Sequence, residues 1–423
     1  MVEQPIDVIV QIAGRDMPAG RLWTHRSGRG ESATFSYLQD YLQRAEAYEL
    51  DPALPLLEGQ HHTPVEQAMF GAMSDCAPDG WGRRLVRRAE QHQAREADST
   101  QRGLTELDYL LGARDDLRQG ALRVRAPSSD RYLAVDTESV PHLIGLGRLL
   151  NAAEELERDE PSSEDLRLLL HGASSLGGAR PKAHVLDAQD RLAIAKFPSP
   201  TGDEWDVTRW EAVALKLARL AGIRVPEHEL HIVQDRPVLA VRRFDRDGDR
   251  RIGYMSAMTM LQAKDRQQGS YLEVAEAIEE HSPDAGGDLR ELWRRIVFTI
   301  LISNTDDHMR NHGFLRTSTA GWSLSPVFDL NPNPEGGSVK QLATAIDENS
   351  TEAHLATALD VADLFRLSEE QAWEIAAQVS SATAQWRVLA RATGLSQAQI
   401  ERLEPAFEHE QSTIARNIAV PRT

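Results

Sequence analysis

The amino-acid sequence predicts an α+β protein built from a β-rich part followed by a mostly helical part. Short runs of alternating apolar residues fall into two groups, at residues 7–38 and 182–244, and Gly, Pro, Ser or Asp interrupt them. Apolar residues at helical spacing lie between these groups and fill most of the chain beyond residue 250. The sequence has no internal repeat and no low-complexity tract, so we expect distinct domains and not a repeat array.

Composition narrows the class of protein. The chain has 423 residues, 41% of them hydrophobic, and a formal net charge of −18. That charge argues against a general affinity for nucleic acid or anionic membranes, because both require excess Lys and Arg at the contact. The single cysteine, Cys76, excludes an internal disulfide and a cysteine-based zinc cluster. With no secretory signal and no apolar run long enough for a membrane span, we expect a cytoplasmic protein without a membrane anchor.

The N-terminal region predicts a subdomain at residues 1–125. Three alternating segments, DVIVQIAG, GRLWTH and ATFSYL, indicate a small antiparallel β unit between residues 7 and 38. A helical pattern follows at residues 63–95, with an interruption at 78–80. The run APSSDR at 126–131 is typical of a linker and marks the expected boundary.

Two further regions follow, expected at residues 135–247 and 248–423. The first is β-rich and the second is mostly helical through to LSQAQIERL. A β-rich lobe followed by a helical lobe, with a cleft between them, suggests a kinase-like arrangement. The expected elements of the β-rich lobe are a helix at 161–170 capped by Ser162 or Ser163, a hairpin at 182–197, a helix at 208–223 and a hairpin turning at Asp235-Arg236.

A candidate phosphate loop precedes the first of these hairpins. Phosphoryl transfer needs a loop over the phosphates, a lysine, a base for the acceptor hydroxyl and ligands for magnesium. In SSLGGARPK, residues 174–182, Gly177 and Gly178 would let backbone N–H groups approach phosphate oxygens, and Arg180 and Lys182 add positive charge. A Gly-Gly pair before a strand is more often a simple turn, and the lack of Gly-Lys-Ser/Thr excludes a Walker A loop.

The candidate lysine is Lys196, in the apolar strand LAIAKF. A lysine at an inward position of such a strand needs a partner, and Glu211 on the following helix is positioned to supply one. The alternative is a lysine on an edge strand that points into water.

The candidate base and metal ligands lie in the helical region. Asp306 and Asn311 reproduce the Asp-x4-Asn spacing in which the aspartate accepts the substrate proton and the asparagine oxygen binds magnesium. Asp329, in LSPVFDLNP, stands where a second metal-binding aspartate belongs, after the hairpin HGFL to GWSL. A single aspartate is more often a cap or a turn residue. Two aspartates and an asparagine at these spacings, after a glycine-rich loop and a strand lysine, favour the catalytic interpretation.

Two other stretches have the spacing of metal ligands, but neither predicts a metal site. His308 and His312 have the i, i+4 spacing of paired zinc ligands on a helix, but Gly313 follows directly and no Glu lies between them. We expect His308 to support the catalytic loop instead. DRDGDR at 245–250 has alternating acids like a calcium loop, but its glycine stands at the wrong position, so a hairpin turn is expected.

The motifs SSLGGARPK, AKFPS, RRFDR, NTDDHMRNHGF and SPVFDLNP, together with DCAPDGWGRRLV at 75–86, resemble the HipA-type serine/threonine kinases, the toxin component of type II toxin-antitoxin systems. The likeness extends over nearly the whole chain. It implies kinase-like lobes with ATP and magnesium (Mg2+) as cofactors. It also implies a helix-turn-helix antitoxin as partner, contact with DNA only through that antitoxin, and a protein substrate, with aminoacyl-tRNA synthetases among the family's targets.

The resemblance also implies roles for individual residues. Asp306 would be the catalytic base, and Asn311 and Asp329 would bind magnesium. Residues 241–244 would be the hinge that reads adenine through its backbone, although Arg242 stands where relatives can have an acidic residue. Ser175 would be autophosphorylated with loss of ATP binding, and Ser174 is its neighbour. The implied nucleotide-binding residues are Ser175, Leu176, Gly177, Gly178, Ala179, Lys182, Lys196, Glu211, Arg242, Phe244 and His308.

Two competing functions remain at this point. The chain is either an enzyme or a catalytically silent scaffold that docks an antitoxin, and intact Lys196, Asp306, Asn311 and Asp329 favour the enzyme. A small-molecule kinase acting on a sugar or aminoglycoside would share the Asp-x4-Asn spacing. The N-terminal module and the serine of the loop weigh against it.

Overall fold

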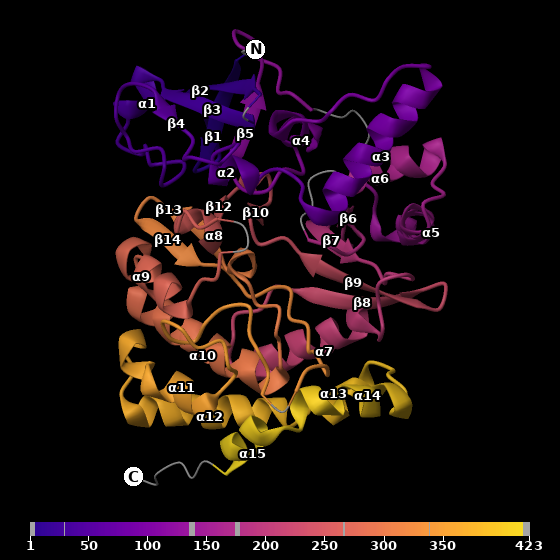
Figure 1. Ribbon diagram of the computed structural model, residues 1–423, viewed down its shortest axis with the longest axis vertical. Coiled ribbons are helices and arrows are strands. Elements are labelled where there is room, and N and C mark those ends of the chain that lie inside the picture. The colour runs from indigo at the N-terminus through magenta and orange to yellow at the C-terminus, as the bar shows by residue number, and fades with distance from the viewer. Residues whose placement is uncertain are drawn as a thin grey trace. The chain divides into compact units, whose positions relative to one another are not determined.

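The structure is a computed structural model that describes residues 5–28, 30–134, 140–173, 178–264, 267–337 and 339–417 (Figure 1). The chain forms two compact units. The first unit comprises Met1–Gly202 and His231–Met255, and the second comprises Asp203–Leu230 and Ser256–Thr423. Both contain helices and strands, as expected for an α+β protein. The three-part division at residues 125–135 and 247 stays a prediction.

A five-stranded antiparallel sheet opens the first unit and includes the β unit expected between residues 7 and 38 (Figure 1). Its strands alternate between buried apolar and more exposed residues, and Val8, Leu22 and Phe35 point into the core. The β1–β2 turn is Ala13-Gly14, both with positive φ of 49° and 80°, which matches the twist of a tight hairpin. The sheet order is β4-β3-β2-β1-β5, formed by β1 (Ile6–Ile12), β2 (Arg15–Ser27), β3 (Gly30–Tyr37), β4 (His61–His62) and β5 (Leu122–Arg125).

A second sheet in the same unit has the order β6-β7-β9-β8. Both expected hairpins are present, but the second turns at Gln234-Asp235, one residue earlier than predicted, because these two residues have positive φ of 50° and 62°. Trp81 and Leu85 of α3 pack in one core with Ala183 and Ala195 of the sheet. The elements are α3 (Gly80–Glu96), α5 (Leu146–Glu157), α6 (Ser163–Ala173), β6 (Lys182–Leu186), β7 (Leu192–Lys196), β8 (His228–Val233) and β9 (Arg236–Arg242).

Short elements complete the first unit. The predicted cap at 161–170 is present, since the Ser162 hydroxyl accepts the Asp165 N–H at 3.1 Å. The DRDGDR segment forms the expected hairpin, β10 with β11. The elements are α1 (Gln39–Leu42), α2 (Gly71–Ser74), α4 (Glu106–Gly112), the 3-10 turn η1 (Leu143–Gly145), β10 (Arg246–Asp247), β11 (Arg250–Arg251) and β12 (Gly253–Ser256), with which the chain enters the second unit.

The second unit is mostly helical and is organised around α10, which is buried over most of its length. Trp210, Trp386 and Phe407 form an aromatic cluster, with the rings of Trp386 and Phe407 stacked at 4.7 Å. None of the described helices combines the length and apolar composition that a membrane crossing requires. The elements are α7 (Val207–Leu220), α8 (Ala257–Met260), α9 (Tyr271–His281), α10 (Ala285–Ile302), η2 (Met309–Asn311), β13 (Gly313–Ser318), β14 (Gly321–Leu324), α11 (Leu355–Asp360), η3 (Ala362–Phe365), α12 (Glu369–Thr383), α13 (Trp386–Ala392), α14 (Gln397–Phe407) and α15 (Glu410–Arg416).

The first unit contains a buried charge network around Asp245. Asp245 accepts two hydrogen bonds from the guanidinium of Arg243, at 2.8 and 2.5 Å, one from Arg246 and one from the backbone N–H of Gly120. Burial alone would raise the pKa of Asp245, but the charges of Arg243 and Arg246 outweigh it and hold that pKa far below its ordinary value. Because Gly120 precedes β5, Asp245 joins the two sheets of this unit.

We expect Asp245→Ala to lower the free energy of unfolding by about 3–5 kcal/mol, because it leaves two buried guanidinium groups without their carboxylate. The pKa of Asp245 is lower in the folded state, so this contribution is present at neutral pH and is lost as pH falls below about 4. Urea unfolding at several pH values measures both effects. Asp247→Ala, which removes an exposed carboxylate two residues away, is the matched control and should change little; equal losses in the two variants would contradict the network.

Candidate active site

The loop after α10 begins at a sharp bend. The apolar segment that ends at Ile302 is a buried helix, and the next residue, Ser303, has a left-handed backbone conformation with φ of 52°. The Asn304 N–H closes the helix end on the carbonyl of Thr299 at 3.0 Å. Ser303 and Asn304 are fully buried. The left-handed residue and this hydrogen bond therefore fix the direction in which the following polar segment leaves the helix.

Hydrogen bonds join this loop to the segment that carries Asp329. The Asn333 N–H donates to the carbonyl of Ser303 at 3.1 Å, and the Asn331 N–H donates to Oδ1 of Asn304 at 3.1 Å. The Asn333 side-chain amide donates to Oγ1 of Thr305 at 2.8 Å. The two stretches that hold the candidate base and a candidate metal ligand are thus bound directly to each other.

The neighbouring acids Asp306 and Asp307 have different environments. Asp306 is exposed, whereas Asp307 is buried and accepts a hydrogen bond from the Tyr271 hydroxyl at 2.6 Å. The His312 ring lies 3.3 Å from the same carboxylate, and the Thr344 hydroxyl donates to the Asp307 carbonyl at 2.6 Å. Burial raises the pKa of Asp307, but His312 and the Tyr271 hydrogen bond outweigh it, so the pKa is lowered. Asp307 therefore anchors the loop and leaves Asp306 at its surface.

Asn311 and Asp329 have the donor chemistry that magnesium prefers. The Asn311 amide nitrogen donates to the backbone carbonyl of Asp306 at 3.0 Å, which leaves Oδ1 as the atom of this side chain able to bind a cation. Asp329 has a φ of 59°, a strained conformation that for a non-glycine residue is frequent at functional sites. Leu330 beside it is buried. These residues fit a magnesium ion held by few protein ligands together with substrate phosphates.

The zinc interpretation has no structural basis at the two histidines. His308 precedes the 3-10 turn η2 and His312 follows it, so they are not on one face of an α-helix. Within the described ranges, no cluster of three or more His, Cys, Asp or Glu side chains could hold a metal ion. The His308 N–H donates to the carbonyl of Asp306 at 2.9 Å, which is consistent with a role in supporting the loop.

In the first unit, two lysines face each other across β6 and β7. Lys182 and Lys196 are directly paired in the register of these strands, so both side chains lie on one face of the hairpin. Ala193 and Ala195 of β7 are buried on the other face. Two lysine side chains therefore start from opposite positions on one face of the hairpin, and lysine is a common phosphate-binding residue. Lys182 is almost fully buried, and Lys196 is half-buried.

The remaining predicted residues are distributed over both units. Glu211 is buried on α7 of the second unit, so its pairing with Lys196 of the first unit stays a prediction. Arg242 ends β9, and the ring of Phe244 packs against Tyr254 at 6.4 Å. Ser174, Ser175, Leu176 and Gly177 lie outside the described residues, whereas Gly178 and Ala179 are described.

Two residues that contact the predicted site segments, Asp307 and Asp79, have no role in the sequence analysis. The sequence assigns the catalytic role to Asp306 and none to Asp307, because the sequence alone does not reveal which of two adjacent aspartates is buried. Asp79 contacts Gly178 of the candidate phosphate loop, although 99 residues separate them. Arg243, which lies within the predicted hinge 241–244, donates to the ring of His184 at 2.8 Å. The Pro-Asp-Gly-Trp-Gly pattern around Asp79 indicates that this segment is special, but it does not reveal that the segment contacts Gly178.

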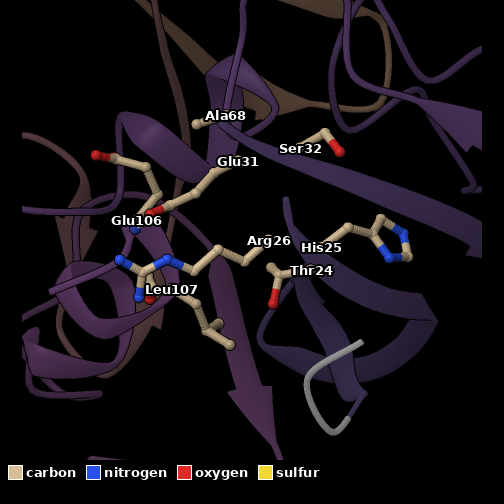
Figure 2. A pocket seen from close by; sticks show the side chains of 9 residues that line it. Thr24, His25, Arg26, Glu31, Ser32, Ala68, Glu106 and Leu107 are labelled. Carbon is tan, nitrogen blue, oxygen red and sulfur yellow. Dashed lines mark hydrogen bonds between the residues drawn. The ribbon is translucent and has the colours of Figure 1, made fainter. Parts of the chain in front are cut away.

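A small pocket in the first unit lies away from all of these residues. It lies between β2, β3 and α4. Figure 2 shows Arg26, Glu31 and Glu106 at one side of it, whereas the neighbouring His25 points the other way. Glu31 accepts the backbone N–H of Glu106 at 2.9 Å, and Glu106 pairs with Arg83 at 2.5 Å. The polar groups of the lining thus serve local structure.

Residues 174–386 match the family described as the HipA-like C-terminal domain. The match covers half of the 423 residues, and the chain belongs to this family.

Solved structures extend the comparison to nearly the whole chain. HipA of Shewanella oneidensis, determined with HipB and operator DNA, matches with a TM-score of 0.65 and 16% identity over 98% of this chain and 100% of that one. This likeness confirms the expected α+β fold of the kinase type. The Helicobacter pylori proinflammatory kinase CtkA matches with a TM-score of 0.42 and 16% identity over 56% of this chain and 91% of that one.

Among curated proteins, the chain is similar to a Haemophilus influenzae protein described as "Putative kinase". The two are 27% identical over 185 residues, which is 38% of this chain. The chain spans about half the length of that relative, 54%.

We expect Asp307→Ala to lower the free energy of unfolding by about 3–5 kcal/mol, because it leaves the Tyr271 hydroxyl and His312 without their buried partner. The folded-state pKa of Asp307 is lowered, so this stabilisation is present at neutral pH and is lost as pH falls below about 4. Thermal and urea unfolding measure it. Asp306→Ala, at the exposed neighbour, is the control, and a loss as large there would refute the division of roles.

Proposed function

We propose that this protein is an ATP-dependent serine/threonine kinase of the HipA toxin type. The observation that supports it best is the pair of joined loops in the second unit. Asp306 is exposed on a loop that buried Asp307 anchors, and hydrogen bonds bind that loop to the segment carrying Asp329. A kinase needs its base and its metal ligands fixed relative to each other before substrate arrives, because most of its rate enhancement comes from positioning.

In this proposal, Asp306 accepts the proton of the substrate hydroxyl as that oxygen forms a bond to the γ-phosphorus of ATP. The bond from the γ-phosphorus to the bridging oxygen breaks, and ADP leaves. Lys182 and Lys196 hold the phosphates from one face of their hairpin. Asn311 and Asp329 would hold magnesium, which supplies charge neutralisation to the phosphates when bound.

The proposed nucleotide contacts include the loop residues. Ser175, Leu176, Gly177, Gly178 and Ala179 would cover the phosphates, Glu211 would orient Lys196, and residues 241–244 would contact adenine. We propose Ser175 as the site of autophosphorylation. A phosphate on that serine would compete with the phosphates of ATP for the same backbone N–H groups, and therefore would prevent nucleotide binding.

The partners we propose follow from the family. HipA of Shewanella oneidensis was determined with HipB and operator DNA. We propose that this chain likewise binds a helix-turn-helix antitoxin and reaches DNA only through it, since a net charge of −18 disfavours direct contact. Its substrate would be a cytoplasmic protein, with aminoacyl-tRNA synthetases as the first class to test.

Asp306→Asn should abolish phosphoryl transfer while leaving the fold and ATP binding intact, because the amide cannot accept the proton and asparagine has nearly the same size as aspartate at this exposed position. Intact-mass spectrometry after incubation with magnesium and ATP, beside calorimetric ATP binding, measures both. An active Asp306→Asn would refute the assignment. ATP binding without transfer in the wild type, on itself and on candidate proteins, would favour the scaffold function.

Ser175→Ala should remove autophosphorylation and leave ATP binding unchanged, because the hydroxyl is the acceptor and the loop backbone is retained. Peptide mapping of the two proteins after incubation with ATP locates the phosphate. Ser174→Ala is the matched control and should still gain one phosphate. Phosphate that persists in Ser175→Ala and disappears in Ser174→Ala would show that the neighbouring serine is the acceptor.

A further inference from the structure

The first turn of α3 makes a two-way contact with Gly178. Asp79 stands at the N-cap position of this helix, where an aspartate usually accepts an N–H of its own helix, but here its side chain caps nothing. Its carboxylate accepts the backbone N–H of Gly178 instead. In return, the backbone N–H of Trp81 donates to the carbonyl of Gly178 at 2.8 Å. Both polar groups of one loop residue are thus held by the start of one helix.

The contact has no room for side chains. A Cβ at Gly80 would lie 2.5 Å from the Gly178 carbonyl oxygen, well inside van der Waals contact. A Cβ at Gly178 would lie 2.6 Å from Nζ of Lys182, and the φ of Gly178 is +86°. Glycine at both positions therefore lets helix, loop and lysine meet at one point. The ammonium group of Lys182 lies against the residue that Asp79 holds.

The other flank of the loop is fixed from the same unit. Arg114 donates to the carbonyl of His171 at 2.9 Å, and Nδ1 of His184 bonds to the carbonyl of Gly172 at 2.9 Å. Burial, followed by the charge of Arg243, holds the pKa of His184 well below its ordinary value, so the ring is neutral and Nδ1 can donate while Nε2 accepts from Arg243. His184 and Lys182 lie two residues apart on β6, so one strand face supports both flanks.

We infer that Asp79 is a positioning residue for the phosphate loop. Together with the Trp81 N–H, it fixes Gly178, and with it the contact between Gly178 and the Lys182 ammonium, before nucleotide binds. The inference rests on the proposed function and adds a part of the N-terminal region to the nucleotide site. Preorganisation of this kind raises affinity because the loop loses less conformational freedom on binding.

The negative charge of Asp79 could have the opposite effect on nucleotide binding, and an experiment distinguishes the two effects. A carboxylate beside a loop N–H and a lysine could compete with phosphate, and removing it would then strengthen nucleotide binding. Asp79→Asn resolves the matter, because its amide oxygen still accepts the Gly178 N–H but carries no charge. Asp79→Ala removes both the acceptor and the charge.

The experiment measures calorimetric binding of ATP with magnesium, and of adenosine, to the wild type, Asp79→Ala and Asp79→Asn. We expect Asp79→Ala to weaken ATP binding about tenfold, the size of one lost hydrogen bond. Adenosine binding should be unchanged, since adenosine has no phosphates for the loop to hold. Asp79→Asn should stay close to the wild type. Asp108→Ala, which removes the capping box of α4 in the same unit, controls for general destabilisation and should bind ATP normally.

The possible failures differ from one another. Wild-type ATP affinity in Asp79→Ala, or tighter binding in both Asp79 variants, would overturn the positioning role while the proposed function stands. Equal losses for ATP and adenosine would also overturn it, because they indicate general damage. A wild type that binds no nucleotide would instead overturn the proposed function. If Asp79→Ala does not fold, Asp79→Glu tests the same point: it keeps the charge and displaces the acceptor, so wild-type affinity there refutes the inference.

Discussion

A buried helix cannot end inside a protein unless its last carbonyl groups and the polar chain that follows find partners. In the second unit, α10 meets this requirement with a left-handed Ser303 and with hydrogen bonds from residues 331–333. The candidate base and a candidate metal ligand are held relative to each other by these same bonds. The same hydrogen bonds that satisfy the end of α10 therefore also fix the relative positions of the residues proposed for phosphoryl transfer.

The bend at Ser303 also places two adjacent aspartates in different environments. Asp307 points inward to Tyr271 and His312, and Asp306 points outward. The inner carboxylate is kept ionised by its partners and stabilises the loop, whereas the outer one is exposed to whatever binds there. A chemically active group and its support thus come from one dipeptide, so the loop can be short.

Much of the local structure could be predicted from the sequence. The hairpin at 182–197, the capped helix at 163–173 and the strand pair around Gly321 follow from alternation, spacing and turn residues, which act over a few residues. Contacts between distant residues could not be predicted this way. Asp79 and Gly178 are 99 residues apart, and neither segment has a sequence pattern that predicts contact with the other. The choice of Asp307 over Asp306 as the buried acid likewise depends on Tyr271, which belongs to another helix.

The packing of Trp81 bears on where this chain can be divided. The family match begins at residue 174, yet Trp81 and Leu85 lie in the same core as Ala183 and Ala195 of the second sheet. A fragment limited to residues 174–386 would lose one wall of that core and expose the apolar residues beneath it. The boundary of sequence similarity is therefore not a boundary of autonomous folding, and the N-terminal region is needed to complete the hydrophobic interior of the domain that follows it.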